Sequence, residues 1–394
     1  MVDQQRGFRE YYVKGDVAGH SGGHDWKVGA DGVFSNVNEK LHYVVTDLQQ
    51  FDPGTAAHFA FSGTGYERDQ ALFAQDEVHL GTWNVAGRLR FDHYKLELDE
   101  TAWSPRIGIS KYFDAAGVLV HASYDRIFET PAIENLLLAS SPQVQAVGDS
   151  ILRFPVAPAR ANFYEIGASK AFAAVLSLDV NVYKRQFKNF PDDDVLLDTG
   201  VSFPIALAHA TVRGAEAKLQ LRSFHRTSGF LSYTNQSGTA QGPITGGLLL
   251  GSEAVAPISA ADSFSISQDQ RNTATARANY QVNKRFWAGA GATYASGLPT
   301  DLSASDVNYA SLLAQYGPQV VGKVNFARGR VRPSFALNFS AGWQLYVREN
   351  KSVSVQAQVA NVLDRVNVIN FEGLFSGTAI APGRGVSVQI RSAF

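Results

Sequence analysis

Apolar and polar side chains alternate over long stretches of this chain, and a period of two predicts β-strands that each have one apolar and one polar face. Between residues 335 and 347, and again over 352–359, nearly every second position is apolar. Helical periodicity is almost absent, and one short helical turn is predicted, inside a loop at 131–139. The alternation predicts about fifteen strands. They cover 8–19, 24–36, 66–79, 82–93, 104–113, 117–126, 161–172, 174–189, 209–222, 227–236, 272–282, 285–295, 335–347, 351–363 and 384–394.

The connections between these strands alternate between short turns and long loops. The short turns lie near 80–81, 114–116, 223–226, 283–284 and 348–350. The long loops cover 37–65, 127–160, 190–208, 237–271, 296–334 and 364–383. A sandwich or propeller has more even loops, whereas this alternation is typical of a transmembrane β-barrel, whose sheet closes because lipid offers no partner to an open edge. The predicted fold is an all-β, transmembrane antiparallel β-barrel.

The composition excludes several other classes of protein. Lys and Arg number 35 against 36 Asp and Glu, so the chain lacks the basic excess of a nucleic-acid binder. Only 18% of the residues are charged, whereas soluble domains have about 25%. Cysteine is absent, which excludes disulfides and a Cys-ligated metal. No apolar run reaches the length of a transmembrane helix, and no apolar region follows Met1, so no signal peptide is predicted in this chain.

The direction of the strands predicts that the front of the barrel is missing. The last strand, 384–394, follows a long outer loop and therefore ends at the periplasmic side, whereas the first, 8–19, leads into a short turn and therefore begins outside. A complete barrel has both ends in the periplasm and an even number of strands. We therefore expect about fifteen strands of a barrel of about 22. Because the edges of such a fragment would be unpaired in lipid, we expect it to assemble poorly alone.

Several segments in sequence order resemble the C-terminal barrel of the TonB-dependent outer-membrane receptors. The run 71–113 is similar to the family's region "QD…W…GLRYD…SPRLG". Its matching residues are Gln75, Asp76, Trp83, Gly87, Arg90, Asp92, Ser104, Pro105 and Arg106. Segments 121–137, 162–172 and 213–221, and the end of the chain from ANVLDRVNV to Phe394, resemble later motifs of that family. The details look nearest to the Oar-like receptors, which carry an N-terminal carboxypeptidase-regulatory-like domain.

The resemblance implies that 1–394 is one receptor-like β-barrel domain without the family's signal peptide, TonB box and plug. It implies an outer-membrane receptor of a Gram-negative-type bacterium that takes up a siderophore, carbohydrate or peptide by TonB-coupled active transport. Its partners would be the bilayer, the barrel-assembly machinery, a small-molecule or oligomer ligand and, through the missing N-terminal part, the TonB system. Capture of the ligand would use the loops 127–160, 237–271 and 296–334. No catalytic activity, cofactor or nucleic acid is implied.

Two other functions are open on the sequence. One is a complete passive porin of about 16 strands. It would need one overlooked strand and an inward loop rich in charge. The longest predicted loop, 296–334, is poor in charge, which is evidence against a porin. The other is an outer-membrane lipase or protease. Such barrels are small, and no motif here brings Ser, His and an acidic residue together. The sequence therefore favours the receptor.

Single residues give weaker predictions. Val386, Val388, Ile390 and Phe394 match the assembly signal that the insertion machinery reads, although lipid-facing strand residues would look the same. The five Trp residues fit girdles at the membrane interfaces, except Trp343, which we expect in a core. Polar-face charges that could pair in the lumen or contact a plug, or simply line a solvated wall, are Arg90, Arg106, Arg126, Glu165, Asp179 and Arg185.

Two groups of residues have the chemistry of metal ligands. His20, His24 and Asp25 lie together in a Gly-rich turn, and Asp192, Asp193, Asp194 and Asp198 crowd a predicted outer loop. A solvated turn and a solvated acidic loop explain them without a metal. No metal site is predicted.

Overall fold

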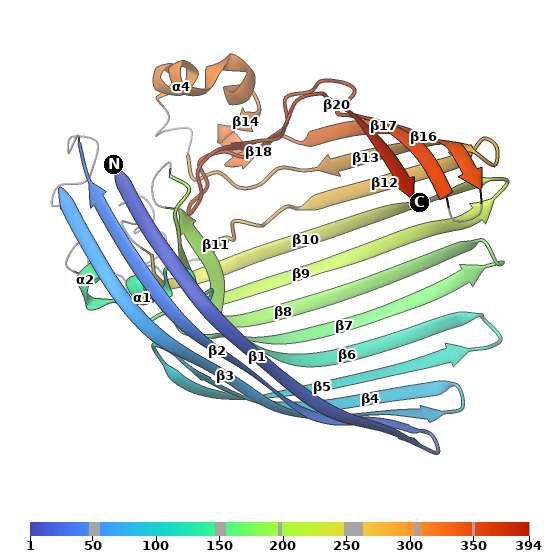
Figure 1. The fold of residues 1–394 in the computed structure, drawn as a ribbon, viewed down its shortest axis with the longest axis horizontal. Helices are drawn as coiled ribbons and strands as arrows, with labels where there is room; N and C mark the ends of the chain where they lie inside the picture. Colours follow the sequence, from blue (N-terminus) through green and yellow to red (C-terminus); the bar gives the residue numbers. More distant parts are fainter. Residues whose placement is uncertain are drawn as a thin grey trace.

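Fifteen long strands form one antiparallel sheet and pair in their order along the chain (Figure 1). The computed structural model describes residues 1–46, 56–145, 155–195, 199–247, 263–302, 308–348 and 351–393. The long strands are β1 (Val2–Ser21), β2 (His24–Val44), β3 (His58–Leu80), β4 (Trp83–Lys95), β5 (Asp99–Phe113), β6 (Val118–Glu129), β7 (Ala159–Phe172), β8 (Leu176–Val195), β9 (Ser202–Phe224), β10 (Thr227–Gly246), β12 (Asn272–Gln281), β13 (Phe286–Ala295), β16 (Ser334–Arg348), β17 (Lys351–Ala360) and β20 (Gly385–Ala393).

Short elements lie in the connections between these strands. The short strands are β11 (Phe264–Ser265), which joins the edge of β10, and the pairs β14 (Val324–Asn325) with β15 (Arg330–Val331) and β18 (Val368–Asn370) with β19 (Ala379–Ile380). The helices are α1 (Leu136–Ala139), α2 (Pro142–Gln145), α4 (Tyr309–Val321) and the 3₁₀ turn η2 (Phe326–Arg328). No helix in the described ranges is long and apolar enough to span a membrane.

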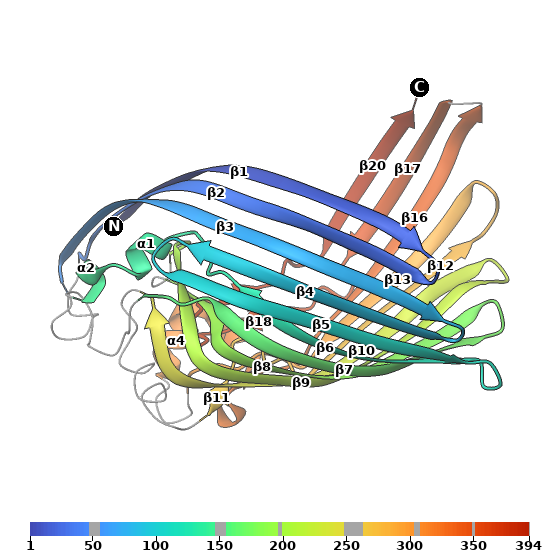
Figure 2. The ribbon, with the colours of Figure 1, turned by 90° about the horizontal axis from the view of Figure 1, so that it is seen from below.

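All fifteen predicted strands are confirmed in the predicted order. Tight turns lie at one end of the sheet and the long connections at the other (Figures 1 and 2). Two of the turns contain a glycine with positive φ, Gly22 at 63° and Gly81 at 62°, as two-residue hairpin turns of the mirror-image types require. We call these the turn end and the loop end.

The predicted loops were too long, and one of them contains a helix that the sequence did not indicate. Most of the predicted loop 37–65 is strand, because β2 and β3 continue beyond the apolar band to Val44 and from His58. The helix α4 lies in the predicted loop 296–334, where the Asn308 side chain accepts a hydrogen bond from the Ser311 N–H at 3.2 Å. Gly317, at φ 76°, interrupts that helix. The predicted helical turn at 131–139 is confirmed by α1.

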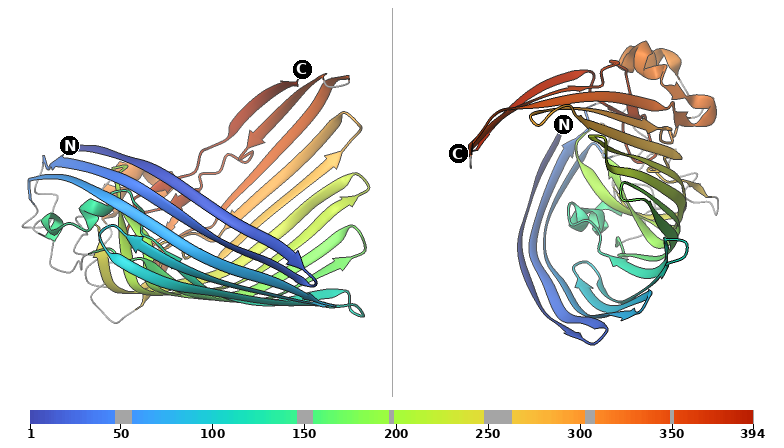
Figure 3. Two further views of the ribbon diagram at one scale, coloured as in Figure 1. Left: turned by 60° about the horizontal axis from the view of Figure 1, so that its bottom comes forward. Right: turned by 90° about the vertical axis from the view of Figure 1, so that its right-hand side faces the viewer.

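The two faces of the sheet differ as the alternation predicted. One face curves around an interior in which α1 lies (Figure 3), and it includes Leu41 of β2. The opposite, outward face is apolar and exposed over a band of each strand. Its exposed members include Val28, Leu72, Leu89, Ile107, Ile166, Val182, Leu219 and Leu231. Such a band matches the hydrocarbon region of a bilayer.

The Trp residues follow this division with two corrections. Trp287, which was expected in a girdle, faces the interior instead, because it has the opposite parity on β13 to the outward Phe286. Trp26, Trp83 and Trp103 are exposed on the outward face near the ends of the band, as the girdle interpretation predicted. Trp343 also faces outward and is 56% exposed, so its predicted place in a core is wrong. It pairs in register with Phe286 close to the turn end, where a large aromatic ring suits the membrane interface.

The sheet is curved and open. Among the described residues, β1 pairs only with β2, and β20 only with β17. Three clusters of buried apolar side chains hold the connections at the loop end. The first cluster packs α1 against β2, β3 and β9. The second packs strands β8 to β10 against the side chains of Ile266 and Phe375. The third packs α4 against β14, β15 and β18.

Candidate functional site

The connection between β6 and β7 turns into the interior, and a buried carboxylate holds it there. Glu39, on the inward face of β2, is 2% exposed. Its Oε2 accepts a hydrogen bond from the Leu138 N–H at 2.9 Å, and its Oε1 accepts one from the Leu137 N–H at 3.4 Å. Asn135, at φ 59°, precedes α1 and donates from Nδ2 to the Ser202 carbonyl of β9. The α1 segment therefore bridges strands on opposite sides of the interior.

The cost of this contact is the burial of Glu39. Burial raises the pKa of the Glu39 carboxyl, and the hydrogen bonds from the backbone of α1 oppose that shift without cancelling it. Glu39 lies beyond Phe34, the last large apolar residue on the outward face of β2, and so lies outside the membrane-spanning part. We call the contact between Glu39 and residues 136–138 the α1 latch.

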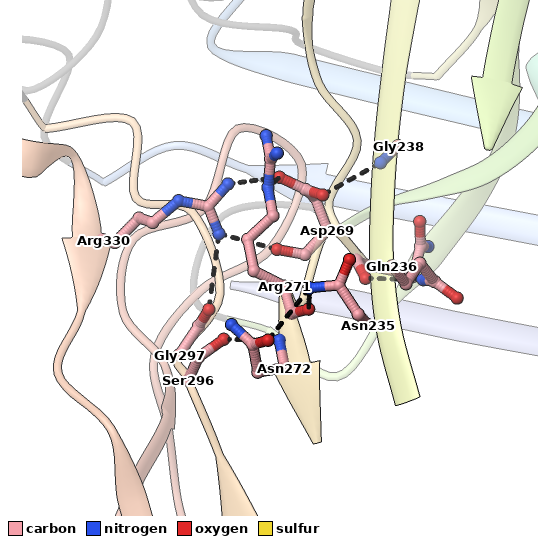
Figure 4. A network of polar contacts seen from close by, with 10 residues as sticks. Asn235, Gln236, Gly238, Asp269, Arg271, Asn272, Ser296, Gly297 and Arg330 are labelled. Carbon is pink, nitrogen blue, oxygen red and sulfur yellow. Dashed lines mark hydrogen bonds and ion pairs between the residues drawn. The ribbon is translucent and has the colours of Figure 1, made fainter. Parts of the chain in front are cut away.

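A second buried carboxylate joins strand β10 and two connections at the loop end, the one between β10 and β12 and the one between β13 and β16 (Figure 4). Asp269 is fully buried. Its Oδ1 accepts a hydrogen bond from the Gly238 N–H of β10 at 2.9 Å, and its Oδ2 accepts from Arg271 Nε at 2.8 Å and from Arg330. Arg330 Nη1 also donates to the Asp269 carbonyl at 2.7 Å and to the Gly297 carbonyl at 3.4 Å. We call this the Asp269 network.

Two further carboxylates act in the same way. Asp192 of β8 accepts hydrogen bonds from Ser267 Oγ at 2.5 Å and Gln268 Nε2 at 3.0 Å, which ties β8 to the β11–β12 connection. Burial raises the pKa of the Asp192 carboxyl against these hydrogen bonds. Glu372 accepts from Thr378 Oγ1 at 2.9 Å and Tyr316 Oη at 2.5 Å, which ties α4 to the β18–β19 region. The connections at the loop end therefore form one hydrogen-bonded assembly over the interior.

Below this assembly the inward wall of β1 to β7 is rich in charge. Arg90 binds both carboxylate oxygens of Asp31, at 2.8 and 2.9 Å, and its Nε lies 2.5 Å from Asp92 Oδ1. Arg106 Nε lies 2.8 Å from Asp125. Arg90, Asp92 and Arg106 belong to the receptor-like motif found in the sequence, and Arg90 and Arg106 form ion pairs on the inward face, which was one of the alternatives that the sequence left open.

The other singled-out charges are placed as follows. Glu165 lies 3.4 Å from His121, and the Ser169 hydroxyl donates to Asp179 at 2.6 Å, both on the inward face. The Arg185 guanidinium stacks over the Phe163 ring at 4.8 Å. Arg126 is exposed on the outward face, at a position that pairs in register with Asn162.

Replacing Arg90 should destabilise the barrel wall. Arg90→Ala leaves Asp31 and Asp92, whose side chains are 17% and 7% exposed, without their cation, which we expect to lower the free energy of unfolding by roughly 2–4 kcal/mol. Lys27→Ala is the control, because the Lys27–Asp16 pair is about a third exposed and should cost less than about 1 kcal/mol. Urea unfolding followed by tryptophan fluorescence measures both; equal midpoints would contradict the prediction.

The inward wall of β12 to β17 is rich in amides instead. Two adjoining cavities of about 360 and 400 Å³ share the inward Trp287. Three cations line them, Arg277, Lys284 and Arg285, and no acidic side chain does. The amides and hydroxyls of the lining are Asn279, Gln281, Asn338, Ser340, Gln344, Ser354, Gln356 and Gln358. This half of the wall can form hydrogen bonds to a polar solute and adds positive charge.

The structure does not assemble the remaining residues singled out in the sequence into a binding site. His20 pairs with Asp25 at 2.7 Å, but His24 pairs with Asp76 on the outward face. Asp198 lies outside the described residues, and within those residues no group of three or more His, Asp or Glu side chains is placed to hold a metal ion. Val386, Val388 and Ile390 are highly exposed on one face of β20, and Phe394 lies outside the described residues, so their role as an assembly signal stays a prediction.

Sequence reasoning missed the buried carboxylates of the loop end. Glu39 follows the alternation into a predicted loop, and Asp269 is a single acidic residue in another. Their partners lie far away in the chain: Leu138 is 99 residues from Glu39, and Arg330 is 61 from Asp269. No local pattern indicates such a pair.

Comparison with known proteins gives one family and one fold. Residues 2–362 match the family described as TonB dependent receptor-like, beta-barrel. No curated protein sequence matches the chain. Among solved structures, a mutant of the ferric enterobactin receptor of Pseudomonas aeruginosa is 17% identical with a TM-score of 0.65, over 99% of this chain and 54% of that one.

Two other solved transporters are similar in fold. The copper transporter OprC is 13% identical with a TM-score of 0.68, over 100% of this chain and 58% of that one. The ferric citrate transporter FecA, in its unliganded form, is 12% identical with a TM-score of 0.65, over 100% and 55%. The chain therefore spans little more than half the length of each of these proteins.

Proposed function

Because the chain belongs to the family of TonB-dependent receptor-like β-barrels, outer-membrane proteins of Gram-negative bacteria, we propose that it forms barrel wall and ligand-capturing loops of a receptor for TonB-coupled uptake. The family and the similar structures are importers and receptors, not enzymes. Members of the family work with the TonB system and bind small ligands in the outer membrane. The protein is accordingly placed in the cell outer membrane.

The observation that carries this proposal is the assembly of connections at the loop end. In an outer-membrane barrel the long loops face the outside, so a solute meets this assembly first. The α1 latch and the Asp269 network give the assembly a fixed shape above a polar wall, as a binding surface needs. A passive porin would also need an inward loop, but one rich in charge, whereas the inward helix α1 is apolar from Leu136 to Ala139.

The names of the similar structures support an order of preference among the ligand classes. Their names include ferric enterobactin, ferric citrate and copper, so we place ferric chelates first and carbohydrates or peptides second. The amide-rich wall of β12 to β17, with three cations and no acidic side chain in its cavities, suits a polar ligand of negative charge. Coupling to TonB is part of the proposal because it distinguishes a receptor of this family from a pore.

Uptake in cells with and without the gene tests the proposal. We supply ⁵⁵Fe-labelled ferric enterobactin, ⁵⁵Fe-labelled ferric citrate and a ¹⁴C-labelled maltodextrin, one at a time. We expect deletion of the gene to lower the uptake of one ferric chelate at least tenfold, and a protonophore to stop that uptake in the parent strain. Uptake that continues in the presence of the protonophore would favour the passive porin, and a loss confined to maltodextrin would change the ligand class.

A further inference from the structure

Basic side chains gather on the outward face of β6 to β9, immediately beyond the apolar band. The register fixes which residues share this face. Tyr124 pairs with Tyr164, Tyr164 with Lys184, and Lys184 with Arg213. The row nearer the turn end is apolar, with Ala122, Ile166, Val182 and Ala215. The two rows nearer the loop end add four more basic residues. We call the set the outer basic patch: Arg126, Arg160, Lys184, Lys188, His209 and Arg213.

Two cross-strand pairs inside this patch join like charges. Lys184 of β8 is the register partner of Arg213 of β9, and Lys188 of β8 is the partner of Arg160 of β7. Side chains in such positions lie about 5 Å apart at Cβ, and like charges there destabilise the sheet. A pair of this kind is tolerated when an anion lies between its members.

The protein supplies one such anion, and to one pair alone. Arg160 Nη2 lies 2.7 Å from Glu100 Oε2. Among the described residues, no acidic side chain forms an ion pair with Lys184, Lys188 or Arg213, and all three are exposed. The pair Lys184–Arg213 is therefore a two-cation site on the membrane side of the protein whose counter-charge comes from outside the chain.

The height of the patch identifies the source of that charge. Tyr124 and Tyr164 pack together with ring centroids 5.2 Å apart, and Tyr164 is 45% exposed, as in the aromatic belt of a membrane interface. Ile166 and Val182, the next outward residues toward the turn end, are more than half exposed and face lipid tails. Lys184 and Arg213 lie in the same row as this belt, and the other four patch residues lie on its loop-end side. The cations of the patch therefore lie at the level of the lipid headgroups of the outer leaflet.

The strands that follow the patch along the sheet are neutral at the corresponding outward positions: β10, β12 and β13 carry Tyr233, Asn235, Asn272 and Tyr294. Outward basic residues recur on β3 and β4, where Arg68 is the register partner of Lys95, but there Lys95 Nζ lies 2.9 Å from Asp99. The pair Lys184–Arg213 differs because no acidic side chain of the described residues forms an ion pair with it.

We propose that the outer basic patch binds the phosphate groups of the phosphorylated glycolipid of the outer leaflet, with one phosphate between Lys184 and Arg213. Lys and Arg are the side chains that bind phosphate most strongly. The lipid's acyl chains then lie along Ile166 and Val182, and the Tyr124–Tyr164 pair marks the boundary between the two parts. This binding is independent of the ligand that the receptor takes up.

Photo-crosslinking in living cells tests the position without changing any charge. The photoreactive analogue p-benzoylphenylalanine replaces Tyr164 in one strain and Tyr294 in another; Tyr294 is an outward tyrosine at the same level, 38% exposed, on β13. After growth with ³²P-phosphate and irradiation, we expect at least fivefold more covalent ³²P on the protein from the Tyr164 site. Equal labelling would overturn the proposal. If a glycerophospholipase removed the label, the bound lipid would be a phospholipid, and the proposal that the patch binds the glycolipid would be overturned.

A charge variant tests the two cations. Lys184→Gln with Arg213→Gln is compared with Lys284→Gln and Arg285→Gln, which remove the same charge from an exposed turn at the opposite end. In protein extracted with a mild detergent, we expect the first variant to retain at least fivefold less phosphorylated lipid per chain, and the control to match wild type. Equal retention would overturn the proposal, as would bound phosphorus that dialyses away as free phosphate.

Discussion

Glu39→Ala should open the α1 latch while leaving the barrel wall intact. The substitution removes the acceptor of two backbone N–H groups, of Leu137 and Leu138, and leaves both buried without a partner. Hydrogen bonds to a charged group contribute about 1.5–3 kcal/mol each, so we expect the latch to lose about 3 kcal/mol, or roughly a hundredfold in its opening equilibrium. Hydrogen exchange of the amides of 136–139, followed by mass spectrometry, measures this change.

The control for this variant is Glu129→Ala, at the exposed end of β6 and the beginning of the same connection. Its exchange at 136–139 should equal that of wild type. If Glu39→Ala also left the exchange of these amides unchanged, the carboxylate would not hold the segment, and the α1 latch would have to be abandoned as a feature of the mouth.

The pH dependence of the latch follows from the raised pKa of Glu39. A carboxyl with a raised pKa binds more protons in the closed state than in the open one, so the closed state is favoured at low pH and loses stability as the pH rises through the raised pKa. Between about pH 5 and about pH 8, opening of 136–139, corrected for intrinsic exchange, should therefore increase. Glu39→Gln cannot titrate and should remove this increase.

Asp269→Ala should release two connections of the loop end together, the one between β10 and β12 and the one between β13 and β16. The carboxylate is fully buried and binds Arg330, Arg271 and the Gly238 N–H. Loss of one partner from a buried ion pair costs about 3–5 kcal/mol, because the remaining groups stay desolvated. We expect faster hydrogen exchange at the amides of Gly238, Thr300 and Val331; the last two donate to the Gly329 and Leu298 carbonyls within the connection that carries Arg330. We also expect cleavage by trypsin in this region at low protease concentration.

The two arginines of the network give a matched comparison. Arg330 is 22% exposed and Arg271 is 44% exposed. Arg330→Ala should therefore reproduce much of the effect of Asp269→Ala, whereas Arg271→Ala should cost less than about 1 kcal/mol, as exposed pairs do. Equal effects of the two arginine variants would show that burial of the carboxylate does not decide the strength of the network.

The sequence predicted the membrane-spanning part of the fold well because that part obeys a local rule. A strand between lipid and a polar interior must alternate, so each strand can be found from its own residues. Beyond the apolar band the constraint ends. There β2 and β3 continue as strands whose inward residues contact α1, and the alternation includes Glu39, a charged residue on a buried face.

The candidate site was predicted in part for a related reason. Arg90, Asp92 and Arg106 were found because they lie in one contiguous motif, and the structure places them on one wall. The α1 latch and the Asp269 network each need one acidic residue and a partner from a distant connection, so neither has a signature in sequence. Trp343 was misplaced because an outward aromatic ring and a core ring follow the same alternation; only the curvature of the sheet tells them apart.

The hydrogen-bonded assembly of the loop end also determines how the cell surface displays this protein to an immune system. Gly238 of β10, Asp269 of the β10–β12 connection, and Gly297 and Arg330 of the β13–β16 connection hold one another in place. The antigenic surface is therefore discontinuous: each patch combines residues that are tens of positions apart in the chain. Antibodies raised against a single synthetic loop peptide would recognise the unfolded chain on a blot and bind intact bacteria poorly, whereas antibodies raised against the folded barrel would show the opposite preference.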